Sequence, residues 1–474
     1  MTELTPMRID GKPVTADDEA VVCSPFDDHE VGRVPVGTTD HVDRAVAVAL
    51  ERHAGPALPT WQRAEILDRA AVVLAEHHEA LARSISDEAA KPIRTARVEA
   101  ARAVDTFRFA AATARTLAGD VVPLDASSAG EGKVGFTLRV PIGVVGAISP
   151  FNFPLNLVAH KVAPAIAAGC PVVLKPASAT PLTALLLARL LEDEAGLPPG
   201  WLNVVTCPGR VADRLVTHDE VALITFTGSA AVGWEIRARA PRKRVGLELG
   251  NNAPVIVHAD ADVEAVAGKV AAAGYAFAGQ TCISVQRVYV HHDVADDFVA
   301  SFTERVAALV VGDPADDATD VSALIDAGET DRVADTVRAA LDGGATALVG
   351  GDRDDHGVYR PTVLTDVTND MAVCADEVFG PVVGVQRYHQ LDEAIDLAND
   401  TRYGLQAGIF TNDLSSALDA AHRLRFGGVC VNEVPSWRAD QMPYGGVGDS
   451  GNTKEGPGWA AREMTEERMV VLQR

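Results

Sequence analysis

The sequence predicts an α/β protein built on parallel sheets. From Val140 onward, short apolar stretches alternate with stretches in which apolar residues recur every three or four positions. A strand over 143–148 is followed by a helix over 156–168, and a strand over 171–174 by a helix over 181–194. Strands that alternate with helices form a doubly wound sheet, which binds ligands at the carboxyl ends of its strands. The loops at those ends are rich in Gly, Ser, Pro and Asn, as a nucleotide site requires.

The N-terminal part of the chain follows a different pattern. Residues 10–36 contain short extended pieces separated by turns. A long helical region comes next, which Asp40 is predicted to cap, and its apolar positions recur through Val42–Leu50, Ala64–Leu81 and Val98–Leu117. Residues 119–140 then interrupt the helical pattern and predict an excursion of two strands.

The alternation of strands and helices continues toward the C-terminus. Strands are predicted at Leu202–Val205 and Ala222–Phe226, with a helix through Ala240. After Glu248-Leu-Gly250 we expect a second α/β domain. Its predicted strands lie at 255–257 and 285–290, its helices at 262–277, 294–309 and 331–341, and a last apolar strand at 469–472.

Composition limits the possible partners. The chain has 474 residues and a net charge of −24, which disfavours binding to nucleic acid or to an anionic membrane. No apolar run is long enough to span a bilayer, and the first residues lack the apolar core of a signal peptide. The six cysteines are scattered, with no Cys-x-x-Cys pair, so we expect a reducing, cytoplasmic location. The pairs His77-His78 and His291-His292 are interpreted as solvated surface, and no metal site is predicted.

One cysteine stands out by its local sequence. Cys282 lies in the stretch Ala278–Ser284, after a Gly-Gln-Thr turn and before an apolar run. A loop that presents a thiol between small residues is a plausible mount for a nucleophile. Taken alone the signal is weak, because most free cysteines are inert residues of the core.

Seven stretches together give the chain a resemblance to the aldehyde dehydrogenase superfamily, in order and in spacing. They are Pro150–Leu155, Leu174–Ser178, Phe226–Ser229, Leu247–Gly250, Gly279–Cys282, Glu377–Pro381 and Pro443–Gly446. The resemblance implies NAD(P)-dependent oxidation of a small-molecule aldehyde and a three-part architecture. The implied parts are a Rossmann-like dinucleotide-binding domain (1–118 and 141–247), a catalytic domain (248–454) and an oligomerisation flap (119–140 and 455–474). The resemblance also implies a homodimer or homotetramer.

The catalytic residues follow from this resemblance. Cys282 would attack the aldehyde and form a thiohemiacetal, whose oxyanion the Asn152 side chain and the Cys282 backbone N–H would stabilise. Hydride transfer would leave a thioester, and Glu248 would activate the water that hydrolyses it. Lys161 and Glu455 resemble the proton-relay positions of the family. From the residues alone, Asn152 would be a turn residue before Pro154 and Glu248 a surface or capping acid.

The resemblance also implies a cofactor site for NAD. Gly228 and Ser229 open a helix whose N-terminus would approach the pyrophosphate. Ser178 stands where strict NAD enzymes of the family often carry Glu, so we expect NADP to be tolerated. The full set of implied cofactor residues is Ile148, Ser149, Pro150, Phe151, Lys175, Ser178, Gly209, Phe226, Thr227, Gly228, Ser229, Val232, Leu249, Gly250, Glu377 and Phe379.

The substrate funnel departs from that of aromatic-lined relatives. The residues assigned to it are Phe153, His160, Thr281, Arg438, Tyr444 and, on an earlier helix, Arg108. A guanidinium suits a carboxylate or phosphonate, so Arg438 suggests an anionic semialdehyde as substrate, unless Arg438 pairs with Asp440 instead. Two rival functions are a CoA-acylating semialdehyde dehydrogenase and a non-catalytic protein on the same fold. The presence of Glu248 disfavours the first, and the presence of Cys282, Asn152 and Glu248 together disfavours the second.

Overall fold

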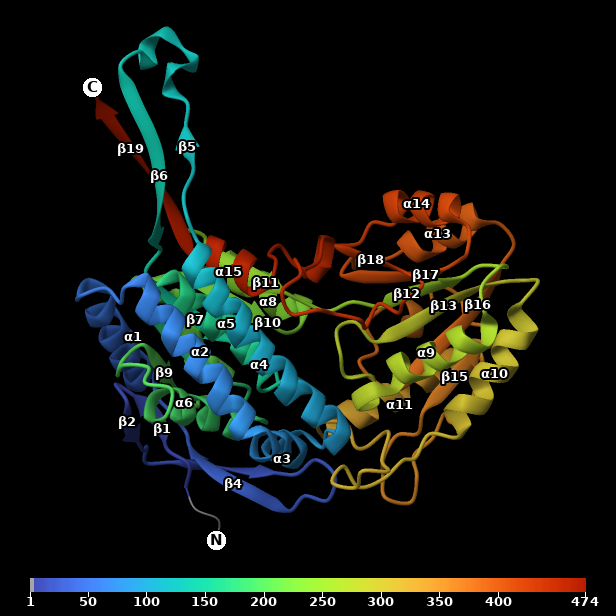
Figure 1. Ribbon diagram of the computed structural model, residues 1–474. Helices are drawn as coiled ribbons and strands as arrows, with labels where there is room; N and C mark the ends of the chain where they lie inside the picture. The colour runs from blue at the N-terminus through green and yellow to red at the C-terminus, as the bar shows by residue number, and fades with distance from the viewer. Residues whose placement is uncertain (1–3) are drawn as a thin grey trace.

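The computed structural model describes residues 4–474 and contains two seven-stranded sheets, with an arm that projects from the first of them (Figure 1). The order of the first sheet is β11-β10-β7-β8-β9-β1-β2. Strands β7 to β11 run parallel, and β1 and β2 extend the sheet antiparallel. Its strands are β1 (Met7–Ile9), β2 (Lys12–Val14), β7 (Val144–Ile148), β8 (Val172–Lys175), β9 (Leu202–Val204), β10 (Val221–Thr227) and β11 (Arg244–Glu248).

Helices cover both faces of this sheet, which explains why its strands are apolar on both sides. On β7, Val145 and Ala147 pack into one core, and Val144 and Ile148 pack into the other. The first core belongs to α2 (Thr60–Glu76), α3 (His78–Ala89), α4 (Ile93–Thr116), α5 (Asn156–Ala168) and α6 (Leu182–Asp193). The second belongs to α1 (Thr39–Ala54), α7 (Gly209–Thr217) and α8 (Ala230–Arg239).

The second sheet has the order β14-β15-β16-β13-β12-β17-β18, and only β14 runs antiparallel to its neighbour. Its strands are β12 (Ala253–Val257), β13 (Val285–His291), β14 (Thr346–Val349), β15 (Thr362–Thr365), β16 (Val382–Tyr388), β17 (Gln406–Phe410) and β18 (Gly428–Val431). One face packs against α9 (Val263–Tyr275), α10 (Ala295–Ala307) and α11 (Ala327–Asp342), with the short α12 (Ala372–Ala375). The other packs against α13 (Leu391–Asn399) and α14 (Leu414–Arg423). The predicted α/β class with two parallel sheets is confirmed.

The arm is a three-stranded sheet in the order β19-β6-β5, and Figure 1 shows it standing away from the body of the molecule. Its strands are β5 (Val121–Val122), β6 (Lys133–Pro141) and β19 (Thr465–Gln473). The excursion predicted to have two strands gains its third from β19, which pairs with β6 from Thr465–Pro141 to Gln473–Lys133. Helix α15 (Pro457–Glu463), just before β19, packs against α4 and α5 of the first domain. A separate hairpin joins β3 (Glu19–Cys23) and β4 (Glu30–Pro35).

Several local predictions were wrong. Thr38, not Asp40, is the N-cap of α1, and its backbone N–H donates to Nδ1 of His41 at 3.1 Å. The helix predicted at 331–341 begins earlier, at Ala327, because the side chain of Asp326 caps it. Strand β11 and helix α7 were not predicted. The charged start of β11 at Arg244 and its place at the sheet edge hide the apolar pattern of a buried strand.

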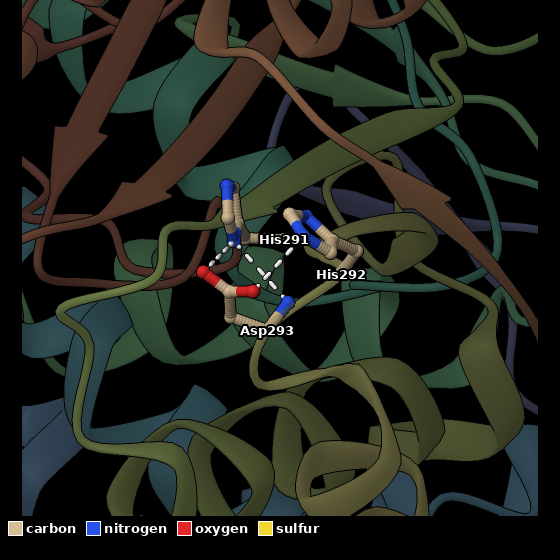
Figure 2. Close-up of side chains that lie close together, drawn as sticks. All are labelled: His291, His292 and Asp293. Carbon is tan, nitrogen blue, oxygen red and sulfur yellow. Dashed lines mark hydrogen bonds and ion pairs between the residues drawn. The ribbon is translucent and has the colours of Figure 1, made fainter.

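The pair His291-His292 also differs from the prediction. His291 is buried at the end of β13, and its ring lies 4.5 Å from that of His292 (centroid to centroid), although adjacent residues of a regular strand point to opposite faces. The chain leaves the strand at this point, so the two rings and Asp293 gather on one side (Figure 2). Among the described residues, no helix combines the length and apolar character needed to cross a bilayer.

Candidate active site

A strained turn presents Cys282. Phe277, Ala278 and Gly279 have φ angles of 49°, 51° and 71°, so three consecutive residues adopt the left-handed region. This conformation is costly for residues with a Cβ atom and persists only where the surroundings hold it. A Cβ atom on Gly279 would lie 2.1 Å from the carbonyl oxygen of Gly380, so the turn is closed against that segment. The loop therefore places Cys282 at a fixed position just before β13.

A cavity of about 400 Å³ opens in front of this cysteine. It brings together five of the residues predicted from sequence: Phe153, Thr281, Cys282, Arg438 and Tyr444. The Cys282 thiol lies 2.9 Å from the Tyr444 hydroxyl. Burial raises the pKa of Cys282 to about 12, although the hydrogen bond from Tyr444 acts in the opposite direction. Burial in this site therefore favours the neutral thiol over the thiolate.

Asn152 reaches the same loop from the first domain. One amide N–H donates to the backbone carbonyl of Gln280 at 2.9 Å, and Oδ1 is buried without a partner among the described residues. The Lys91 ammonium donates to the Asn152 carbonyl at 2.6 Å and pairs with Glu99, and both of these side chains are completely buried. Glu99 in turn accepts the backbone N–H groups of Leu155 and Asn156. This ion pair fixes the loop that carries Asn152, and sequence reasoning did not identify it.

Glu248 ends β11 at the carboxyl edge of the first sheet. Both of its carboxylate oxygens are buried with no hydrogen-bond partner among the described residues. Burial, and next the nearby negative charge of Glu455, raise the pKa of Glu248 well above its ordinary value. A carboxylate with a raised pKa and free acceptor positions is suited to taking a proton near neutral pH.

The predicted cofactor residues line a second region of the first domain. A cavity of about 370 Å³ is lined by Ile148, Lys175, Gly209, Phe226 and Val232. A neighbouring cavity of about 210 Å³ contains Ser178, and Arg210 lines both. Sequence reasoning missed Arg210, which follows the predicted Gly209 directly.

The remaining cofactor residues lie outside these two cavities. Ser229 is the N-cap of α8, and the backbone N–H of Gly228 donates to the Glu248 carbonyl at 3.1 Å. The rings of Phe151 and Phe379 meet edge to face at 5.9 Å. Ser149 has a buried hydroxyl with no partner in the described chain, Pro150 is half-buried, Leu249 is buried, and the hydroxyl of Thr227 accepts from Lys161 at 2.6 Å.

Glu377 lies beside Gly250. A Cβ atom at residue 250 would lie 2.1 Å from Oε2 of Glu377, and Oε1 accepts the backbone N–H of Asn251 at 2.9 Å. Burial raises the pKa of Glu377 to about 7. These groups fit a dinucleotide, because a helix N-terminus would face the phosphates and carboxylate, hydroxyl and aromatic groups would face the nicotinamide end. Glu377, Lys175 and Ser178 would hold the two riboses, and the bound nicotinamide would accept a hydride.

Comparison with known proteins decides the class of this site. The profile of the Aldehyde dehydrogenase family matches residues 14–470. The chain belongs to this family.

Several similar proteins align with all or nearly all of this aldehyde dehydrogenase. 3-Sulfolactaldehyde dehydrogenase of Priestia aryabhattai is 44% identical over 100% of both chains. Aldehyde dehydrogenase 21 of Physcomitrella patens, solved with the reaction product succinate, is 37% identical with a TM-score of 0.97 and covers 100% of this chain and 99% of its own. Glyceraldehyde-3-phosphate dehydrogenase GapN of Methanocaldococcus jannaschii, solved with NADP, is 38% identical with a TM-score of 0.92, over 97% of this chain and 100% of that one. The predicted three-part fold and the NAD(P)-dependent aldehyde dehydrogenase class are thereby confirmed.

Behind the cavity of the dehydrogenase lies a buried network of charges. Lys161 lies 3.8 Å from Glu455, and Glu455 pairs with Arg438 at 2.9 Å. Burial raises the pKa of Glu455, but Arg438, His160 and Lys161 outweigh it, so the pKa lies below its ordinary value. Burial lowers the pKa of Lys161. The predicted relay residues are thus adjacent, and Arg438 belongs to the same network.

Arg438 has a different partner from the one considered from sequence. Asp440 was considered as its partner, but the guanidinium bonds Glu455 and lies 3.0 Å from Nε2 of His160. The guanidinium lies 3.9 Å above the Tyr444 ring, and its Nε is buried with no partner in the described chain. His160 is buried beneath the cavity, where it bonds Asp440 at 2.9 Å, and it does not line the cavity.

The second arginine of the cavity is Arg102, not Arg108. Arg108 is exposed and pairs with Asp105, away from the cavity. Arg102 lines the cavity and bonds Asp440 through Nη2 at 2.8 Å and Nε at 3.2 Å. Helical spacing could have identified Arg102 from the sequence. Glu99, Arg102 and Thr106 lie three and four residues apart, on the face of α4 that meets α5. Arg108 lies on another face.

Proposed function

We propose that this enzyme oxidises a short aldehyde with an anionic tail to the corresponding acid, using NAD or NADP. The observation that carries the proposal is the presence of two guanidinium groups, Arg102 and Arg438, in the cavity that contains Cys282. Both are already paired with carboxylates, so recognition rests on their remaining N–H donors, such as Nε of Arg438, rather than on net charge.

The position of Arg438 limits the length of the tail. The Tyr444 ring contacts Arg438 on its face and Cys282 through its hydroxyl, so a single phenol separates the guanidinium from the nucleophile. A substrate with its anion a few atoms from the aldehyde carbon spans that separation. The relatives support this class, because 3-sulfolactaldehyde and the product succinate are both short and anionic.

The proposed reaction uses the residues in a fixed order. The Cys282 thiol gives its proton to water in the cavity, the thiolate attacks the aldehyde carbon, and the Asn152 amide and the Cys282 N–H stabilise the oxyanion. Bound NAD(P) would accept the hydride of this adduct, so that the carbonyl would reform and Cys282 would carry the acid as a thioester. Glu248 takes a proton from water as the water attacks this thioester, and the acid leaves as the sulfur is released. Lys161 and Glu455 connect Glu248 to the buried network and are proposed to pass that proton onward.

The test compares two arginines on the same helix. Arg102→Gln should lower kcat/KM for 3-sulfolactaldehyde and succinate semialdehyde by roughly tenfold to a hundredfold, because a charge-assisted contact contributes about 1.5–3 kcal/mol. Butanal should lose little. Arg108→Gln, the matched control, should behave as wild type with all three substrates. An equal loss for charged and neutral aldehydes, or a wild-type preference for butanal, would overturn the anionic-substrate proposal. Added CoA should not accelerate turnover, since release depends on water.

We also propose a cytoplasmic homodimer or homotetramer that is joined through the arm. Support for the oligomer comes from exposed apolar side chains on the arm, which a monomer would leave in contact with water. They are Val121, Leu138, Val471 and Leu472. Support for the cytoplasm comes from cysteines that remain unpaired throughout the described chain.

A further inference from the structure

Four histidines gather at one edge of the second sheet, on three neighbouring strands. His258 follows β12, His291 ends β13, His292 follows it, and His389 follows β16. Because β12, β13 and β16 run parallel and adjacent, their carboxyl ends meet at the same edge. The rings are in contact, with centroids 5.6 Å apart for His258 and His291 and 4.4 Å apart for His292 and His389. The aldehyde dehydrogenase reaction uses none of these side chains.

Within this group, three consecutive residues converge their donor atoms (Figure 2). Nε2 of His292 lies 2.9 Å from Oδ1 of Asp293, and Nδ1 of His291 lies 3.5 Å from Oδ2. All three donor atoms fall within 4.8 Å of one another. Around a tetrahedral ion with bonds of about 2.0–2.2 Å, donor atoms lie roughly 3.3–3.6 Å apart. The two His–Asp separations, 2.9 and 3.5 Å, are already close to that spacing.

A hydrogen bond already prepares His291 for this role. Its Nε2 lies 3.0 Å from the backbone carbonyl of His389, and only the protonated nitrogen can donate to a carbonyl. The lone pair is therefore on Nδ1, the atom that faces Asp293. Histidines that bind metals commonly donate their second nitrogen to a carbonyl in this way. At present Nδ1 accepts only a long bond of 3.3 Å from the backbone N–H of Asp293.

We propose that His291, His292 and Asp293 bind one divalent transition-metal ion, with the exposed His389 beside His292 as a candidate fourth ligand. Two imidazoles and a carboxylate favour Zn²⁺ or Co²⁺ over Mg²⁺ or Ca²⁺, which prefer oxygen ligands. The site lies at the opposite end of β13 from Cys282, so the ion would join β13 to the start of α10 rather than take part in catalysis. Occupancy should thus raise thermal stability and leave turnover unchanged.

Co²⁺ is the probe that tests this proposal. The untagged full-length enzyme, freed of metal with a chelator and dialysed, is titrated with Co²⁺ and followed by its visible absorption and by thermal unfolding. We expect saturable binding of one ion, d–d bands without a thiolate charge-transfer band, and a raised Tm. Mg²⁺ should not compete. His292→Ala and Asp293→Asn, both at exposed side chains, should weaken binding at least about tenfold.

The control is His356→Ala, which removes an exposed histidine from a distant loop and should bind Co²⁺ as wild type does. All variants should keep wild-type aldehyde oxidation in the absence of metal, which separates this proposal from the catalytic one. Binding that is equal in wild type, His292→Ala and Asp293→Asn would overturn the site. A thiolate charge-transfer band would place the ion on a cysteine and would overturn it equally.

Discussion

At the residue scale, one guanidinium affects the pKa of two carboxyl groups. Arg438 bonds Glu455 and lowers its pKa, and the charge of Glu455 in turn raises the pKa of Glu248. A change at Arg438 therefore alters substrate contact and the proposed general base together. Arg102 touches neither carboxylate, since its partner is Asp440. Substrate recognition is accordingly tested more cleanly at Arg102 than at Arg438.

Replacing Glu248 should separate the two halves of the reaction. Glu248→Gln keeps the size of the side chain but cannot take a proton from water, so each active site should release one NADH rapidly and then stall at the thioester. Steady-state kcat should fall by roughly a hundredfold or more, the range that a general base contributes. Rapid-mixing absorbance at the NADH band measures both phases. Unchanged steady-state turnover would show that another group serves as the base.

Arg210 should determine how well NADP is used. It lines the same cavity as Ser178, where a 2′-phosphate would lie, and a guanidinium binds phosphate through paired N–H donors. Arg210→Gln should raise KM for NADP roughly tenfold and leave KM for NAD nearly unchanged. The exposed Arg242 supplies a control, and Arg242→Gln should change neither value. A parallel loss with both cofactors would assign Arg210 to the shared part of the dinucleotide.

At the element scale, helices of the first domain cap one another across the core. Pro181, the N-cap of α6, offers no side-chain acceptor, and Glu88 of α3 takes its place. The Glu88 carboxylate accepts the N–H groups of Leu182 at 2.7 Å and Thr183 at 3.0 Å. The carboxylate also meets the positive end of the α6 dipole. The position of α3 against α6 therefore depends on one buried acid.

Removal of that acid should destabilise the fold. Glu88→Ala leaves two N–H groups at the start of α6 unpaired and should cost about 2–4 kcal/mol, whereas Glu79→Ala, at an exposed position on α3, should cost far less. Urea unfolding monitored by circular dichroism gives both values. A loss at residue 88 no larger than that at residue 79 would contradict the capping role.

Glu88 should also leave a signature in the pH dependence of stability. Burial raises its folded-state pKa to about 8, above the ordinary value of 4.5, so the folded chain keeps a proton that the unfolded chain loses between these values. The contribution of Glu88 to stability thus declines as pH rises from about 5 to 8. The glutamine side chain of Glu88→Gln cannot titrate, so the unfolding free energy of this variant should lack this part of the pH dependence.

Particular elements show why the sequence predicts some parts of the fold and of the active site and does not predict others. The whole of α5 is apolar enough that Asn156–Ala168 was predicted with the bounds that it has. Cys282, Phe153 and Tyr444 were placed at one site because linear motifs carry them. Arg102 and Asp440 are 338 residues apart, whereas Arg438 and Glu455 are 17 apart and Lys91 and Glu99 are 8 apart, and none of these pairs lies within one helix or strand. No local pattern encodes such partners, because tertiary packing selects them.

At the scale of the whole molecule, the site is assembled from distant parts of the chain. Asn152 and Glu248 come from the first domain and Cys282 from the second, while Tyr444 and Glu455 come from the segment that returns toward the arm. The backbones of Tyr444 and Glu455 bridge each other, and Glu248 bridges Gly451. The same C-terminal segment thus closes the active site and then supplies β19 to the arm.

The exposed apolar residues of the arm should join subunits. Leu472→Glu combined with Val471→Lys would place charges where the proposed interface needs apolar contact, so the enzyme should shift toward monomer in light scattering coupled to size-exclusion chromatography. Leu414→Glu, at an exposed apolar residue of α14 far from the arm, serves as the control and should leave the molar mass unchanged. An arm variant with the mass of wild type would place the interface elsewhere.

The pairing of β6 with β19 has a consequence for biosynthesis. Pro141 pairs with Thr465, so most of the chain separates the two strands. At about 5–20 residues per second, the ribosome releases β19 roughly 20–60 s after β6. During that interval β6 exposes an unpaired edge with apolar neighbours, which is the kind of surface that pairs with other chains. Nascent chains on one message are therefore at greatest risk of entanglement at the arm, and a chaperone that covers β6 would protect the chain until β19 has been made.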